Sequence, residues 1–185
     1  PASVEVLWET WNNAEEVTAN SVIASVSLVG SYVVFSTPET LKPGNAVIAA
    51  KDGAGTILWS WHLWFPDADL EGSKQTYPSG AVLMDRNLGA LSATYTSSNT
   101  ADWGLMYQWG RKDPFHNSKS PEFISGYISS NASTVYRPAI LGTAENYYMA
   151  YTPNSTVAYV NKNPQYLYSS WYINSSSYDQ TEWAS

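Results

Sequence analysis

Residues 46–64, with the sequence AVIAAKDGAGTILWSWHLW, decide the fold class of this chain. Two runs of strand-forming residues, 46–50 and 56–64, lie on either side of a short loop that contains Asp52 and Gly53. A loop with Asp-Gly between two such runs is typical of an antiparallel hairpin. We therefore predict a hairpin here and a mainly β fold around it.

The second arm of this hairpin has two unlike faces, because neighbouring residues of a strand point to opposite sides. One face is wholly apolar and consists of Ile57, Trp59, Trp61 and Leu63. The other is mixed and consists of Leu58, Ser60, His62 and Trp64. We predict that the apolar face is buried, since large aromatic side chains dominate cores. Trp64 and His62 are then the candidates for contact with a ligand. A stacking platform for sugar rings, made of Trp59, Trp61 and Trp64, is the alternative.

The composition indicates a folded, β-rich chain. Its 185 residues are 44% hydrophobic, 15% aromatic and only 14% charged, which is too apolar for a disordered chain. The formal net charge of −7, with no cluster of basic residues, argues against nucleic acid and anionic membranes as partners. The absence of cysteine excludes disulfides, thiolate catalysis and cysteine-based metal sites. No apolar run approaches the ~20 residues of a membrane-spanning helix.

Two compositional regions divide the chain. Residues 1–115 contain most of the Val, Ile, Leu and Trp residues, whereas residues 116–185 are rich in Ser, Asn and Thr and contain ten of the 14 Tyr residues. We predict an N-terminal β region at 1–80 and a second region at 81–185, lectin-like or irregular β, that is separate or packs with the first. The expected architecture is antiparallel, sandwich-like sheets with one short helix and long loops rich in Tyr, Ser and Asn.

Elements outside the hairpin follow from local patterns. Strands are expected at residues 4–8, 21–29, 32–35 and 81–84. The short helix is expected at residues 102–112, where Asp102 is a candidate N-cap and Pro114 follows the last turn. Gly104 and Gly110 oppose a helix in that segment.

Three segments resemble a known group of proteins. They are GNAVIA at 44–49 with ILWSWHLW at 57–64, MDRNLG at 84–89, and GLMYQWGRKDPF at 104–115. In that order they are similar to surface proteins of gut Bacteroidales, including fimbrillin-like proteins and relatives of the major paralogous domain of Fibrobacter. The resemblance covers roughly residues 1–115. It implies export, frequently as a lipoprotein, a role in adhesion or surface structure, and a C-type-lectin-like fold in the later part. The family's Cys-Pro-x-Gly-Trp-Arg-x-Pro type segment does not occur before Ser185, so only part of that fold is expected.

Asp67, Asp69 and Glu71, followed by Gly72, resemble the start of a calcium loop, with oxygen ligands on alternate residues. The position for the closing bidentate Glu is Pro78, so we favour a solvated acidic turn over a metal site. Calcium is therefore the one cofactor left open.

Arg86, Trp109 and Arg111 complete the set of speculative ligand-contacting residues. Asp85 and Arg86 are neighbours on an expected strand, so we do not expect them to pair with each other. Arg86 is expected to reach backbone carbonyls or a distant carboxylate as a structural residue, and a ligand role for Arg86 or Arg111 is the alternative.

No catalytic signature is found. The only histidines, His62 and His116, lack the paired spacing of a metal site, and no nucleophile elbow, P-loop or dinucleotide fingerprint occurs. We predict a non-enzymatic, exported bacterial surface protein, adhesive or fimbria-associated, whose partners are other surface or fimbrial subunits. A carbohydrate-binding module that uses exposed Trp and Tyr is the alternative, and a glycoside hydrolase fragment is a third reading. Because the chain opens at Pro1 without a signal region, we expect a trimmed protein or a part of a longer one, extracellular or on the outer membrane and anchored by an upstream lipoprotein signal.

Overall fold

The computed structural model describes residues 1–11, 20–95, 101–105, 107 and 112–114, together with the backbone of three short strands nearer the C-terminus. Those strands are β8 (Thr134–Val135), β9 (Tyr147–Ala150) and β10 (Tyr166–Tyr168). They form a sheet of order β10-β9-β8, in which β8 and β9 are antiparallel and β9 and β10 are parallel. The described part of the chain is strand-rich and has no helix, which confirms the mainly β prediction. None of its segments is therefore a helix that could cross a membrane.

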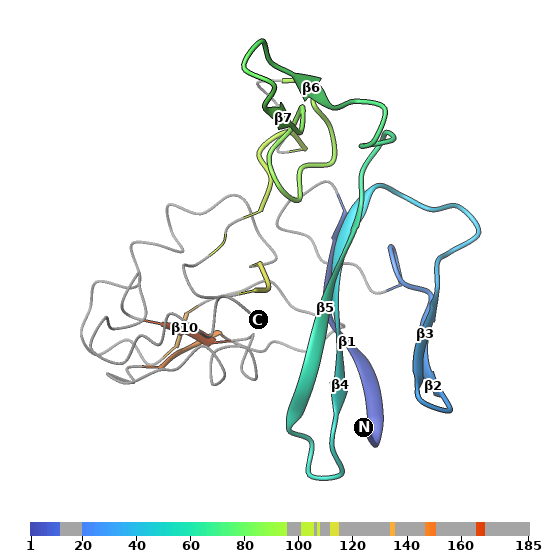
Figure 1. Ribbon diagram of the computed structural model, residues 1–185. Coiled ribbons are helices and arrows are strands. Elements are labelled where there is room, and N and C mark those ends of the chain that lie inside the picture. Colours follow the sequence, from blue (N-terminus) through green and yellow to red (C-terminus); the bar gives the residue numbers. More distant parts are fainter. Residues whose placement is uncertain are drawn as a thin grey trace.

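A three-stranded antiparallel sheet, here called the central sheet, organises the N-terminal part (Figure 1). It consists of β1 (Ser3–Trp11), β4 (Gly44–Lys51) and β5 (Ile57–Phe65), in the order β1-β4-β5. The predicted hairpin is confirmed as β4 and β5. Its loop is held by Asp52, whose Oδ1 accepts hydrogen bonds from the backbone N–H groups of Ala54 and Thr56, both at 2.9 Å. An Asp side chain that bonds to its own following backbone is a common device in tight turns.

A two-stranded hairpin lies beside one face of the central sheet (Figure 1). It consists of β2 (Ser25–Val29) and β3 (Tyr32–Ser36), and β2 contacts β1. The buried residues Val22, Ile23 and Ala46 join this layer to the central sheet. The two layers give the sandwich-like arrangement that the composition predicts.

One buried carboxylate anchors the approach to β2. Glu9 is fully buried, and its side chain accepts hydrogen bonds from the backbone N–H groups of Ser21, Val22 and Ile23 at 3.1, 3.0 and 2.9 Å. The predicted strand at 21–29 therefore begins only at Ser25, because residues 21–23 donate to this carboxylate instead of to a neighbouring strand. Burial of a charge is tolerated when several donors surround it.

Two irregularities change which residues share a face. The β1–β4 register shifts between Val6 and Trp8, and the β4–β5 register shifts so that Ala50 faces Trp59 while Lys51 faces Ile57. Ile57 therefore lies on the face opposite Trp59, where it joins a core of Leu7, Trp8, Val47 and Ala49, with Leu105 packed against it. The prediction that Ile57 and Trp59 share a face is wrong because a bulge reverses the alternation between them.

The short helix predicted at 102–112 is wrong in its described residues. Asp102 and Trp103 lie in a turn, and Gly104 has φ of +77°, which an α-helix does not contain. A Cβ atom on Gly104 would lie 2.8 Å from both Asn87 Cβ and the Leu88 carbonyl oxygen. Close packing, and not helix formation, explains this glycine. The predicted strand at 81–84 is reduced to β7 (Val82–Leu83), which pairs with β6 (Gln75–Thr76).

Candidate functional site

The three segments that carried the resemblance meet on one side of the central sheet, in a region we call the junction. The backbone N–H of Leu105 donates to the carbonyl of Leu88 at 3.0 Å. Gly89 has φ of +82°, and a Cβ atom there would lie 2.8 Å from Leu105 Cγ. The glycines of both motifs therefore permit two backbone segments to pack closely.

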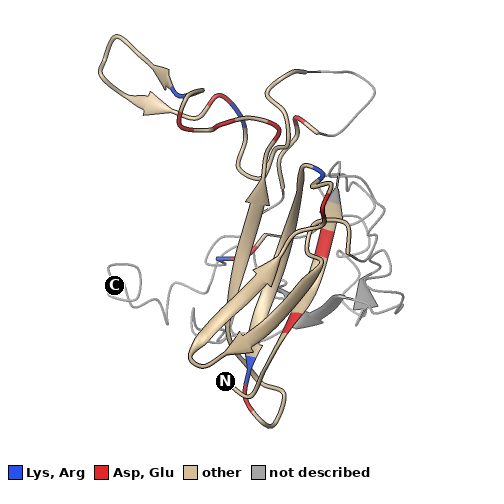
Figure 2. Ribbon diagram, turned by 90° about the vertical axis from the view of Figure 1, so that its right-hand side faces the viewer, with Lys and Arg blue, Asp and Glu red and all other residues tan. Residues whose placement is uncertain are grey.

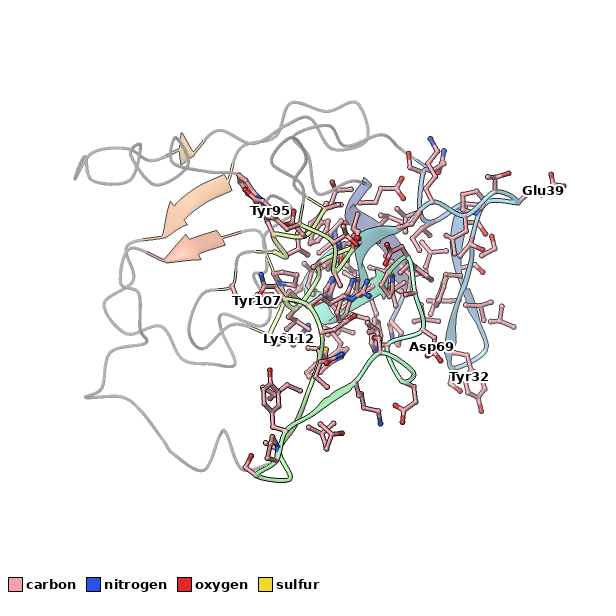
Figure 3. The ribbon with its side chains drawn as sticks, turned by 90° about the horizontal axis from the view of Figure 1, so that it is seen from above. Tyr32, Glu39, Asp69, Tyr95, Tyr107 and Lys112 are labelled. Atoms are coloured by element: carbon pink, nitrogen blue, oxygen red, sulfur yellow. The ribbon has the colours of Figure 1, made fainter. Side chains whose placement is uncertain are left out.

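A chain of side-chain hydrogen bonds ties the junction to β4 and β5. Asn45 Nδ2 donates to the Gly89 carbonyl at 2.9 Å, which leaves Asn45 Oδ1 facing His62 Nε2 at 2.9 Å. The hydrogen of the imidazole is thus on Nε2, and Nδ1 accepts from the Tyr107 hydroxyl at 3.5 Å. Figure 3 places Tyr107 and Lys112 on the opposite side of the central sheet from Tyr32.

Burial keeps this imidazole neutral. Desolvation lowers the pKa of His62 to about 4; Lys112 adds to the decrease and Asp113 opposes it. Desolvation, and then the charge of Asp113, raise the pKa of Tyr107 well above its ordinary value. The Tyr107–His62–Asn45 chain is consequently neutral over the physiological pH range, which suits a structural connection.

Lys112, Ser60 and Asp113 form a second connection along β5. Lys112 Nζ donates to the Ser60 carbonyl at 2.7 Å and to Asp113 Oδ2 at 2.7 Å, and Ser60 Oγ donates to the same carboxylate oxygen at 2.5 Å. Lys112 Nζ also lies 4.9 Å from the centre of the Trp59 ring. Both Ser60 and Asp113 are buried, so this cluster joins an edge strand to the segment that follows the junction.

Both ligand candidates of β5, His62 and Trp64, form hydrogen bonds within the junction. His62 forms the bonds given above, and the Trp64 indole N–H donates to the Ala90 carbonyl at 2.9 Å. Each side chain is half-buried. The other two aromatic and basic candidates, Trp109 and Arg111, lie outside the described residues.

Arg86 is a structural donor. Its Nε and Nη2 atoms donate to the two oxygens of Asp85 at 2.8 and 3.1 Å, and its Nη1 donates to Asp67 Oδ1 at 2.6 Å and to the Leu91 carbonyl at 3.2 Å. The prediction of a distant carboxylate and a carbonyl is confirmed. The prediction that Asp85 and Arg86 do not pair is wrong, because β7 ends at Leu83 and both residues lie in a bend. The bonded Arg86 guanidinium lowers the pKa of Asp85.

The acidic loop after β5 does not gather its carboxylates. Asp67 pairs with Arg86, Asp69 Oδ1 accepts from the Glu71 backbone N–H at 3.0 Å, and Glu71 pairs with Lys74. Within the described residues no three His, Asp or Glu side chains form a group that could hold a metal ion. Asp69 and Glu71 have local partners, as in a solvated turn, whereas Asp67 is bound by the distant Arg86.

The other face of the central sheet is the surface that the sequence did not predict. Trp59 is 50% exposed and Trp61 is 38% exposed, so the prediction that they are core residues is wrong. The β2–β3 hairpin covers only part of this face. The hairpin itself carries no charged side chain (Figure 2). An open groove of about 480 Å³ remains between β3 and the face of β4 and β5. We call it the apolar groove; its lining is Pro1, Ser31, Tyr32, Val33, Phe35, Ile48, Ala50, Leu58, Trp59, Trp61 and Leu63.

Tyr32 and Phe35 line the apolar groove but were not predicted as site residues from the sequence. Both are exposed, at 74% and 38%, although they belong to an apolar strand. The signal in the sequence was the run YVVF at 32–35, which is apolar on both faces, whereas a sheet with one solvated face normally alternates. Phe35 packs edge-on against Phe65 with ring centres 6.4 Å apart, and this contact joins the hairpin to the central sheet.

Comparison with protein-family models, with curated proteins and with solved structures gave no match.

Proposed function

We propose that this chain is a non-catalytic module of an exported bacterial surface protein, with a role in adhesion or in fimbria-associated structure. It acts at the outer-membrane surface, anchored by an upstream lipoprotein signal, and binds other surface or fimbrial subunits. The observation that carries the proposal is the apolar groove, which brings Trp59 and Trp61 of the central sheet together with Tyr32 of β3. The similarity of three segments to Bacteroidales surface proteins supports the location.

The groove suits an extended segment of polypeptide. In the described part of the chain β3 pairs with β2 alone, so its outer edge carries no strand. Because β2 contacts β1 while residues of β3 line the groove with those of β5, a strand added to β3 would lie over Trp59 and Trp61. Backbone pairing gives such a complex its affinity, and alternate apolar side chains in the groove give it specificity. We therefore expect the partner to supply a strand with apolar residues at alternate positions.

The location is testable with single cysteines, since the native chain has none. Tyr95 is 75% exposed and lies outside the groove lining, so Tyr95→Cys should react with a membrane-impermeant maleimide on intact cells of the producing bacterium. Val47→Cys, at a fully buried position, is the matched control and should not react. Labelling of Tyr95→Cys only after lysis would contradict the surface location.

The groove is testable by photo-cross-linking on the same cells. A photoreactive phenylalanine analogue replaces Trp61 in one variant and Trp103, which is 48% exposed and outside the groove lining, in another. A protein adduct of defined mass at position 61 and none at position 103 is the expected result. Equal adducts at both positions, or none at either, would mean that the groove is not the contact surface.

A carbohydrate-binding module is the second candidate function. It is favoured by the exposure of Trp59 and Trp61 on alternate positions of one strand, which presents two ring faces in a row. Against it, the described lining of the groove has few polar atoms to hydrogen-bond sugar hydroxyl groups, and ligand sites need such groups for orientation. A glycan adduct in place of a protein adduct at position 61 would decide for this candidate.

A further inference from the structure

A second, polar pocket lies away from the apolar groove, in the loops that follow β7. It has a volume of about 280 Å³, and its described lining is Met84, Asp85, Arg86, Asn87, Ser92, Ala93 and Asp102. Carboxylate, guanidinium, amide and hydroxyl groups therefore meet in a pocket near the lower end of the size range of small-molecule sites.

Arg86, which lines this pocket, is held in place by hydrogen bonds within the protein. The side chain of Arg86 is only 3% exposed and is held by Asp85, Asp67 and the Leu91 carbonyl. Asn87 Nδ2 donates to the Trp103 carbonyl at 3.2 Å, which ties one wall to the other. Such pre-organisation lowers the entropy lost on binding.

One atom of the pocket lacks a partner. Asp102 Oδ1 is the single buried side-chain oxygen or nitrogen without a hydrogen bond in the described part of the chain. A buried, unpaired acceptor is unfavourable, so this oxygen is left in need of a donor. Asp102 lines the pocket, and access of a ligand to this oxygen requires rotation of the half-buried side chain about its soft carboxylate torsion.

The charges select the class of ligand. An anion would meet Asp85 and Asp102, while the N–H groups of Arg86 are directed to Asp85, Asp67 and Leu91. A cation would meet the Arg86 guanidinium, and no group of three acidic or histidine side chains surrounds it among the described residues. A neutral molecule avoids both conflicts.

The hydrogen-bonding groups point to hydroxyl groups in particular. Asp102 Oδ1 and Asn87 Oδ1 are acceptors, and the Ser92 hydroxyl accepts from the Thr94 backbone N–H at 3.1 Å, which leaves its own hydrogen to donate. A molecule with several hydroxyl groups both donates and accepts at adjacent atoms. We propose that this pocket binds a neutral, hydroxyl-rich ligand, a single sugar ring of a glycan, with Asp102 as the main acceptor.

The test is an NMR titration of the full, 15N-labelled chain. The probes are the methyl pyranosides of glucose, galactose, mannose and fucose, and calcium chloride alone is the ionic probe. At least one glycoside should shift the amide signals of residues 84–87, 92, 93 and 102. Asp102→Asn and Ser92→Ala should each weaken that binding by about tenfold or more, and Glu39→Gln, which removes a distant exposed carboxylate, should not.

Three outcomes would overturn the proposal. They are no shift at these residues with any glycoside, equal affinity in wild type, Asp102→Asn and Ser92→Ala, or a response to calcium chloride alone, which would indicate a cation site. Trp59→Ala alters the groove and the contact with Lys112 but no residue of this pocket, so it should keep the glycoside response while losing the surface partner. These results distinguish a failure of the proposal for this pocket from a failure of the proposal for the groove.

Discussion

His62 Nε2 lies 2.9 Å from Asn45 Oδ1 across the β4–β5 pair, and this contact places the hydrogen of the neutral imidazole on Nε2. Since burial lowers the pKa of His62 to about 4 from 6.5, the unfolded chain binds a proton more readily than the folded one between these values. The stabilisation is therefore complete above pH 6.5 and is lost as the pH falls toward 4. At 1.36 kcal/mol per pKa unit, the loss amounts to at most about 3 kcal/mol.

We predict that His62→Gln flattens the pH dependence of the free energy of unfolding in this window, measured by urea denaturation at a series of pH values. At pH 7 the variant is less stable, because the bond to Tyr107 is lost. His116→Gln changes the only other histidine and is the matched comparison. Equal flattening by both variants would contradict the assignment to His62.

Replacing Glu9 by Gln should be strongly destabilising. An amide in its place keeps one oxygen, which can accept from Val22 and Ile23, but it brings an NH2 group against the Ser21 N–H and removes the negative charge of the acceptor. The expected cost is about 2–4 kcal/mol in the free energy of unfolding. Glu5→Gln is the control, since Glu5 is an exposed residue paired with Lys51, and its loss should cost no more than about 1 kcal/mol. Similar losses for the two variants would mean that the Glu9 carboxylate contributes no special anchoring.

Trp8→Ala and Trp59→Ala should differ sharply in stability. Trp8 is 2% exposed in the core, and its truncation should cost about 3–5 kcal/mol. Trp59 is half exposed, so its truncation should cost about 1 kcal/mol, which includes the contact with the Lys112 ammonium. Denaturant titration of both variants checks this, and a cost for Trp59→Ala as large as that for Trp8→Ala would return Trp59 to the core.

Gly104→Ala should destabilise the junction. The new Cβ atom would meet Asn87 and Leu88 at 2.8 Å, and the φ of +77° is strained for any residue with a side chain. Together these effects should cost about 2–4 kcal/mol. Gly53→Ala is the control, because nothing lies within 4 Å of a Cβ atom there and its φ is not in the left-handed region. If thermal unfolding of Gly104→Ala matched that of Gly53→Ala, the close approach of the two backbones would be disproved.

Local structure could be predicted well from the sequence. Which residues share a face of a sheet, and whether that face is buried, could not. The Asp52-Gly53 loop and its flanking runs identified the β4–β5 hairpin, because turn chemistry and strand propensity act within a few residues. The exposure of Trp59 and Trp61 depends on how far the β2–β3 hairpin extends over the central sheet, which no local pattern encodes. The bulge that separates Ile57 from Trp59 likewise arises from pairing with β4. The predicted helix failed where tertiary contact requires a left-handed Gly104.

The candidate site was harder to predict for a similar reason. Trp64 and His62 are polar enough to suggest a ligand, yet their partners, Ala90 and Asn45, lie 26 and 17 residues away in the sequence. Arg86 was assigned a structural role correctly, since a guanidinium next to several carboxylates normally finds one. Its pairing with adjacent Asp85 was missed because the end of β7 could not be located.

The alternation along β5 separates two selective constraints on one short strand. Ser60, His62 and Trp64 hold the junction, whereas Trp59 and Trp61 face the groove. Mutations at 59 and 61 are thus free to alter what the groove recognises while the three residues between and beside them preserve the fold. We expect relatives of this chain to diverge at positions 59 and 61 and to agree at positions 60, 62 and 64, so that one scaffold serves many partners.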